Sequence, residues 1–292
     1  MEIKSIPQII NEIQESLDQN DYESAYDIAK DNVDLNKEYL EGEYVFKNLL
    51  EELLFQVLIQ GEIKKKIPLI LDYSTLYSNY GEILLHFDKI EDGKKSFALS
   101  KNYNPINIKA NFGLAEIAKM ESNIEEFYKL SIESFKIAYY PKDLAKSFRN
   151  LSFYFLRIAE DESSKDNLEE NLRLAISLKK ISQDFDEDSD LAMHELNEIN
   201  EKINKFDKEL VESIENMDLN DCKSFLKSKG LPYEAGIEII TICKNLGFQL
   251  DEAKKVVPAL FYFNIAYDLT KDEDIKLVID DLNEKVERKL NE

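Results

Sequence analysis

Two histidines are the first candidates for acid–base or metal chemistry in this chain. His86 and His194 each stand in a helical pattern, and neither has a second His or a Cys at the spacing of metal ligands. His194 and Glu198 are four residues apart, but two ligands do not make a zinc site. We therefore expect no resident metal, and we assign both histidines to the surface or to satisfied interior positions.

Adjacent carboxylates are the second candidates, and they occur at residues 51–52, 186–188 and 280–281. In a chain with 59 acidic residues such pairs arise by chance, so a solvated helix face explains them better than general acid–base catalysis. The run at 186–188 superficially resembles a calcium loop, but Asn197 stands where the closing Glu belongs. A Gly-rich phosphate loop, a nucleophile elbow and an HExxH string are absent from the sequence. The residues thus predict a protein that is not an enzyme and has no cofactor.

A third set of polar residues recurs along the chain. Asn79, Asn111, Asn150 and Asn264 each stand one residue before an apolar residue that is followed by a small one. A carboxamide offers both a donor and an acceptor, so it can pair with the C=O and N–H of a peptide without adding charge. The alternative is that these side chains make helix–helix contacts or reflect an Asn-rich composition.

The elements that must position these residues are helices. Apolar residues with a helical period fill residues 6–17 and 22–29, which predicts a helical hairpin, and a dense apolar helix is predicted within 39–60. The chain has 8 Gly and 6 Pro, too few for the turns of an all-β domain. We therefore predict an all-α chain of about fourteen helices.

From residue 73 the helical pattern repeats. Three strings read Asn, apolar, small, and each is followed by a polar turn and a second helix. Their small residues, Gly81, Gly113 and Ser152, are 32 and 39 residues apart. A fourth copy ends at Ala266. The predicted turns lie at 88–92, 121–123 and 160–166, and the less regular segment 186–258 is punctuated at 218–220, 230–232 and Gly247.

The stretch from Tyr77 to Pro105 resembles a tetratricopeptide repeat, a helical hairpin of 34 residues. Such a hairpin cannot bury its apolar face alone, so neighbouring hairpins must stack. The resemblance implies an α-solenoid of antiparallel hairpins wound into a right-handed superhelix. We divide the chain into degenerate hairpins at 1–72, the clearest repeats at 73–185, and a C-terminal region at 186–292 with a final hairpin near 259–290. The matching residues are Tyr77, Tyr80, Gly81, Leu84, Gly93, Phe97, Ser100 and Pro105.

The resemblance also implies a concave groove lined by the first helix of each repeat. In peptide-binding members of the family, asparagines at this position hold the main chain of an extended ligand. In this chain we expect Tyr77, Lys109 and Arg149 to shape or charge the groove. Glu82 stands where the family's clamp for acidic C-terminal peptides has Asn, so that clamp is not expected here. The predicted peptide-binding residues are Asn79, Asn111, Asn150, Tyr77, Lys109 and Arg149.

Charge and composition limit the partner. The formal net charge of −22 would repel nucleic acid and anionic lipid, and the one compact basic run, residues 64–66, reads as a loop or a solvated helix end. Cys222 and Cys243 are expected to be free buried thiols. No apolar run is long enough for a membrane span or a signal peptide core, so we expect a cytoplasmic protein.

These observations predict a non-catalytic scaffold that binds an extended peptide or a partner helix in a concave groove. One alternative is a regulatory sensor whose repeats bind a signalling peptide and switch a partner, with 186–258 as its effector surface. Another is an export or assembly chaperone that shields a hydrophobic segment, which a large apolar concave patch would favour. The identity of the partner and the oligomeric state stay open.

Overall fold

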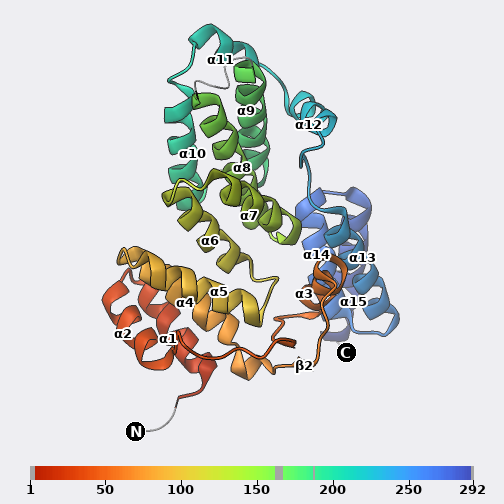
Figure 1. Cartoon of the computed structure of the whole chain (residues 1–292). Helices are drawn as coiled ribbons and strands as arrows, with labels where there is room; N and C mark the ends of the chain where they lie inside the picture. Colours follow the sequence, from red (N-terminus) through yellow and green to blue (C-terminus); the bar gives the residue numbers. More distant parts are fainter. Residues whose placement is uncertain (1–3, 162–166, 187, 291–292) are drawn as a thin grey trace. The chain divides into compact units, whose positions relative to one another are not determined.

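The computed structural model describes residues 4–161, 167–186 and 188–290 of the chain (Figure 1). Fifteen α-helices fill most of these described residues, together with one pair of two-residue strands. The prediction of an all-α fold is therefore confirmed. Most of the predicted turn at 160–166 and Glu187 of the acidic run lie outside the described residues.

The chain forms two compact units, Met1–Leu130 and Ser131–Glu292. Their boundary falls inside α7 (Ile124–Ile137), whereas the boundaries expected from the sequence, after residues 72 and 185, fall within the units. The first unit holds α1 (Ile6–Asp18), α2 (Tyr22–Asn32), α3 (Leu49–Leu54), α4 (Tyr73–His86), α5 (Ile90–Tyr103) and α6 (Ile108–Met120). The second holds α8 (Pro141–Glu160), α9 (Leu168–Phe185), α10 (Asp190–Ile203), α11 (Lys208–Glu215), α12 (Leu219–Ser228), α13 (Ile237–Glu252), α14 (Val256–Thr270) and α15 (Glu273–Leu290).

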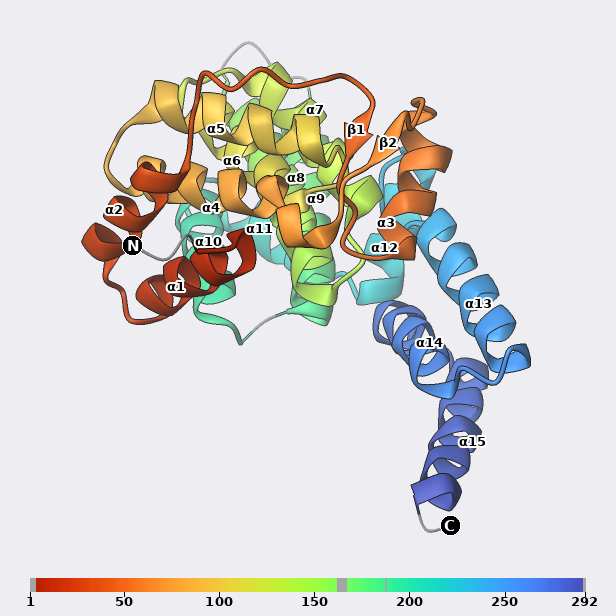
Figure 2. The same cartoon turned by 90° about the horizontal axis from the view of Figure 1, so that it is seen from below.

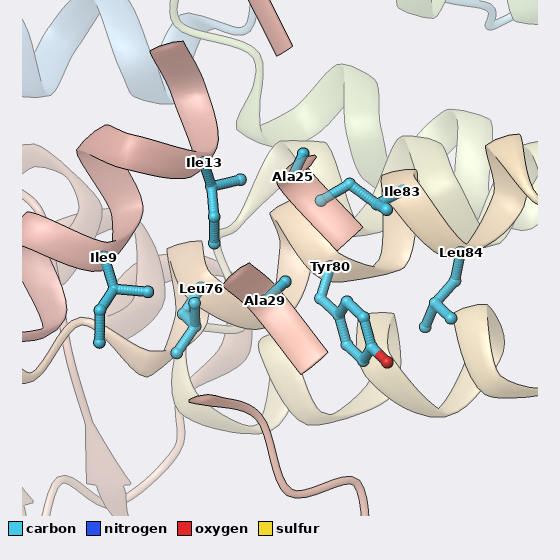
Figure 3. Close-up of a cluster of buried hydrophobic side chains, with 8 residues drawn as sticks. All are labelled: Ile9, Ile13, Ala25, Ala29, Leu76, Tyr80, Ile83 and Leu84. Carbon is cyan, nitrogen blue, oxygen red and sulfur yellow. The ribbon is translucent and has the colours of Figure 1, made fainter. Parts of the chain in front are cut away.

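The first unit begins with the predicted hairpin, α1 and α2. The backbone N–H of Ser5 donates to the Gln8 side chain at the start of α1, and the Asp21 carboxylate accepts from the backbone N–H of Ser24 at the start of α2. Asn20, in the left-handed region at φ 57°, closes the turn between them. Both helices pack their apolar stripes against α4 (Figure 3). The buried residues of this cluster are Ile9, Ile13, Ala25, Ala29, Leu76, Tyr80, Ile83 and Leu84.

The helix predicted within 39–60 is shorter than expected. It begins at Leu49, where the Asn48 side chain accepts from the backbone N–H of Glu51, and it continues as a π-helical turn over Phe55–Ile59. Gly42, with a φ of +92° in the left-handed region, keeps a helix from running through the start of this segment. The residues before Asn48 instead form β1 (Glu43–Tyr44), which pairs in parallel with β2 (Lys65–Lys66).

Helices α4 and α5 form the hairpin of the clearest repeat, and its glycine sits at a close helix–helix approach. A Cβ on Gly81 would lie 2.7 Å from the Phe97 ring, and a Cβ on Gly113 of α6 would lie 2.2 Å from the same ring. Phe97 therefore fills a space that two glycines leave open, one on each side. The turn after α4 is closed by Asp88, whose φ of 57° is also left-handed.

A buried polar seam crosses the same hairpin. The Ser74 hydroxyl on α4 donates to the Ser100 carbonyl of α5, and the Ser100 hydroxyl donates back to the Ser74 carbonyl at 2.7 Å. The Asn107 side chain, which caps α6, donates to both hydroxyls. Because every one of these groups is buried and paired, the seam fixes how α4, α5 and α6 meet.

In the second unit α8 packs along α9, and the Ser152 hydroxyl donates to the Ala175 carbonyl across that contact. Gly247, expected to punctuate the chain, instead lies buried inside α13, where a Cβ would meet the Phe263 ring of α14 at 2.7 Å. Helix α14 packs against both α13 and α15, so a hairpin is present near 259–290. The glycine–aromatic contact of α14, however, is with the preceding helix α13 and not with α15.

Candidate functional site

Two of the predicted asparagines each stand two residues before a glycine, on neighbouring helices of the first unit. Asn79 lies in the middle of α4 and Asn111 lies in α6, which packs against α4. They are 2% and 1% exposed. We expected both to line an open groove, and in the structure neither does.

Lys109 lies over the Asn79 carboxamide. Its ammonium donates to Asn79 Oδ1 at 2.9 Å and forms an ion pair with the Glu82 carboxylate at 2.5 Å. Lys109 and Glu82 remain partly exposed, with side-chain exposures of 38% and 47%. The structure therefore joins the predicted residue Lys109 to Asn79 at the edge between α4 and α6. Because the lysine is partly exposed, it can give up these contacts for others.

Each of the two buried carboxamides keeps one polar atom without a hydrogen-bond partner in the described part of the chain. On Asn79 this atom is Nδ2, a donor, and on Asn111 it is Oδ1, an acceptor. The Thr75 hydroxyl, one turn before Asn79 on the same side of α4, is also buried without a partner. A buried polar group without a partner costs about 1–3 kcal/mol, so three of them on two helices require an explanation.

Tyr77 lies on the other side of α4, where the prediction did not place it. Residues two apart on a helix point in nearly opposite directions, so Tyr77 and Asn79 cannot line one groove. The Tyr77 ring is buried, and its hydroxyl donates to the Asp34 carbonyl at 2.8 Å. Burial raises the pKa of Tyr77 above its ordinary range. This side chain thus anchors the segment that follows α2.

Arg149 and Asn150 belong to α8, in the second unit. The Arg149 side chain is 1% exposed, and its Nε donates to the Glu195 carboxylate of α10 at 2.6 Å. The Asp186 carboxylate lies 3.7 Å from Arg149 Nη2. The guanidinium therefore holds α8 to α10 and to the end of α9. The predicted role, charging an open groove, does not agree with this burial. Asn150 is half-buried.

The fourth asparagine of the predicted set, Asn264, is exposed on α14 and does not share the buried environment of Asn79. A better match to the glycine–phenylalanine contact, although not to the buried asparagine, was missed in the sequence. Asn245, Leu246 and Gly247 also read Asn, apolar, small, and Gly247 contacts Phe263 as Gly81 contacts Phe97. The signal was present, because Phe97 and Phe263 each follow their glycine by sixteen residues.

Other chemistry-bearing residues have structural surroundings. The exposed His86 ring stacks on Tyr22 with ring centroids 3.6 Å apart, and His194 is exposed on α10. Within residues 4–161, 167–186 and 188–290, no three His, Cys, Asp or Glu side chains are grouped to hold a metal. Cys222 and Cys243 are free and buried, and burial raises the pKa of the Cys243 thiol to about 12, which leaves it protonated at neutral pH.

Neither a family model nor a curated protein matches the sequence of this chain. Among the described helices, none combines the length and the apolar character that a bilayer crossing requires. The function must therefore be inferred from the residues at the edge between α4 and α6.

Proposed function

We propose that this chain is a non-catalytic, tetratricopeptide-like scaffold that binds an extended segment of another protein at the edge between α4 and α6. The match of Tyr77–Pro105 to the repeat pattern supports the family, and the glycine–aromatic contacts of α4, α5 and α13, α14 give the pattern a physical basis. The proposed binding residues are Asn79, Asn111 and Lys109, all in the first unit.

The observation that carries this proposal is the pair of unpartnered amide atoms. Asn79 offers a donor and Asn111 offers an acceptor, and a peptide main chain presents one acceptor and one donor at every residue. A ligand that pairs with both atoms would remove the cost of leaving them unpaired in the free protein. The net charge of −22 favours a protein partner over a nucleic acid.

Access to the Asn79 amide runs past Lys109. Its ammonium contacts Asn79, and its side chain is partly exposed, so it can swing out when a ligand approaches. Exposed side chains change rotamer within nanoseconds, which makes this opening fast compared with binding. A ligand carbonyl can then accept from Asn79 Nδ2 while Lys109 keeps its pairing with Glu82.

A peptide library displayed on phage and selected against the full chain tests the proposal. Selected peptides, resynthesised with a fluorescent label, should bind the wild-type chain and lose roughly 3- to 10-fold in affinity on Asn79→Ala or Asn111→Ala. That factor corresponds to one hydrogen bond of about 0.5–1.5 kcal/mol. Fluorescence anisotropy gives the affinity, and circular dichroism reports whether each variant stays folded.

Asn245→Ala is the matched control, because Asn245 has the same local sequence but lies exposed on α13. It should leave the affinity unchanged. Selection of no peptide, or equal affinity in all three variants, would contradict the proposed site.

A further inference from the structure

The segment that follows α2 lies against the rest of the first unit in the way that a bound peptide lies against its receptor. Residues 33–40, here called the strap, run as an irregular coil from the end of α2 toward β1 (Figure 2). Their exposure alternates along the chain, which is the pattern of a segment that buries every second side chain. Val33, Leu35, Lys37 and Tyr39 are half-buried, and Asp34, Asn36, Glu38 and Leu40 are exposed.

The strap covers an aromatic face made by α4 and the end of α5. Tyr73, Tyr77 and Tyr103 form this face, and Tyr103 stacks on Tyr77 with ring centroids 5.9 Å apart. The Tyr77 hydroxyl holds the strap's main chain at the Asp34 carbonyl, and the Tyr39 ring meets Tyr103 edge-on at 5.3 Å. One main-chain contact and alternating side-chain contacts are also how grooves hold peptide ligands.

A lysine occupies the centre of the contact. The Lys37 ammonium lies 3.5 Å from the centroid of the Tyr73 ring and 5.9 Å from that of Tyr103. An ammonium over a tyrosine ring gains about 0.5–2 kcal/mol, and only a cation makes this gain. The face therefore favours a cationic side chain over a neutral one. An aliphatic side chain would suit a purely structural seam.

The ends of the strap are also held by helix packing on one side and by backbone hydrogen bonds on the other. Helix α2 packs on α4 before it, and after it the backbone N–H of Val45 donates to the Tyr103 carbonyl while β1 pairs with β2. The eight residues between these anchors can therefore lift from the tyrosines without unfolding a helix, as local openings in native proteins do.

We propose that the strap is a resident pseudo-ligand, and that the face of Tyr73, Tyr77 and Tyr103 binds a partner segment with the spacing aliphatic, any, Lys or Arg, any, aromatic. The pattern is that of Leu35, Lys37 and Tyr39, which already fill the face. The partner displaces the strap and takes its contacts. This site lies on the opposite side of α4 from Asn79, so it is additional to the proposed α4–α6 site and does not depend on it.

A labelled peptide with the sequence of residues 33–40, VDLNKEYL, is the probe. On the wild-type chain it should bind weakly, because the tethered strap competes at an effective concentration in the millimolar range. On the full-length double variant Leu35→Ser, Lys37→Ser it should bind at least about tenfold more tightly. A probe with Ala in place of its lysine should lose roughly 2- to 30-fold, the equivalent of one cation–π contact.

The matched control is the double variant Asn36→Ser, Glu38→Ser, which changes two exposed strap residues and should bind the probe as the wild type does. Asn79→Ala should also leave probe binding unchanged, which separates this site from the proposed function. Equal affinity of the wild type and the Leu35, Lys37 variant, or equal binding of the two probes, overturns the proposal.

A second measurement applies if the strap variant does not fold. Hydrogen exchange on the wild-type chain should show strap amides that exchange faster than those of α4, and faster still when the probe is added in excess. Strap amides as protected as α4, with or without probe, overturn the proposal. So does a wild-type dimer that the probe dissociates, because the face would then be filled by the strap of a second copy.

Discussion

The hairpins α4–α5 and α13–α14 are built on one contact and differ in what surrounds it. Gly81 meets Phe97 in the first, Gly247 meets Phe263 in the second, and both contacts would place a Cβ 2.7 Å from the ring. In the first hairpin, however, the phenylalanine also meets Gly113 of the next helix. The glycine–aromatic contact thus brings two helices together in both places, and in one place it brings in a third.

The residues at equivalent positions show what the third helix changes. Buried Ser100 of the polar seam corresponds to buried Ala266, and buried Asn79 corresponds to exposed Asn245. The same local string, Asn then apolar then Gly, therefore gives a buried amide where α6 and Lys109 cover it and a free surface residue where no such cover exists. A repeat position acquires its role from its neighbours in space.

Removing the two phenylalanines is the largest test of this comparison. Phe97→Ala and Phe263→Ala should each lower the free energy of unfolding by about 3–5 kcal/mol, because both rings are 1% exposed and leave a cavity. Phe97→Ala should cost more, since its ring contacts two glycine-bearing helices. Urea denaturation followed by circular dichroism measures both. Leu277→Ala, at a side chain that is 68% exposed, should change stability by less than about 0.5 kcal/mol.

Adding a methyl group to each glycine gives a smaller and graded effect. Gly113→Ala should destabilise most, because its Cβ would lie 2.2 Å from the Phe97 ring, and Gly81→Ala and Gly247→Ala should follow with similar losses of about 1–3 kcal/mol. Gly236→Ala is the control, since its Cβ would meet no atom closer than 3.8 Å. Thermal unfolding ranks the four variants. If Gly247→Ala behaved like Gly236→Ala, the two hairpins would not share the contact.

Exchanging the polar and apolar seams sharpens the comparison further. Ser100→Ala should lower stability by about 1–3 kcal/mol, because it leaves the buried Asn107 amide and the Ser74 carbonyl short of a partner. Ala266→Ser should cost about 1–3 kcal/mol for the opposite reason, since it buries a hydroxyl among apolar side chains. Chemical denaturation of both variants checks the signs. A neutral Ala266→Ser would mean that the α13–α14 seam accepts a polar group as readily as α4–α5.

The sequence was sufficient for the parts of the fold that depend on local periodicity. The α1–α2 hairpin, the α4–α5 hairpin and the turn at 121–123 follow from apolar spacing and polar breaks, and the structure has them. It was insufficient where one glycine had two readings. The sequence at Gly247 predicts a break, although a glycine inside a helical pattern also marks a close approach, and only its distance to Phe263 distinguishes the two.

The sequence indicates which residues of the candidate site share a helix, but it does not indicate which way their side chains face. The sequence places Asn79, Asn111 and Lys109 in one site, and the structure joins Lys109 to Asn79, yet the burial of both asparagines depends on the side chains and helices that cover them. Tyr77 was grouped with Asn79, although two residues on one helix that are two apart cannot face one groove. The burial of Arg149 was not predictable, because its partner Glu195 is 46 residues away in the sequence.

Alkaline pH should also separate the two hairpins, because their equivalent positions hold different titratable groups. At one position the first has Tyr77 and the second has Cys243, and burial raises the pKa of Cys243 from 9.0 to about 12. Burial also raises the pKa of Tyr80 from 10.0 to about 12. Each group ionises first in the unfolded chain, so the free energy of unfolding falls as pH rises through these windows. The contribution of Cys243 to stability is complete below pH 9 and is lost above it, whereas that of Tyr80 is lost only above about pH 10.

Urea denaturation from neutral pH upward should therefore show a decline in the free energy of unfolding that begins near pH 9 in the wild type and is smaller in Cys243→Ala. Tyr80→Phe should change the decline only above about pH 10. If Cys243→Ala followed the wild-type curve, the thiol would be less buried in solution than it is in the structure.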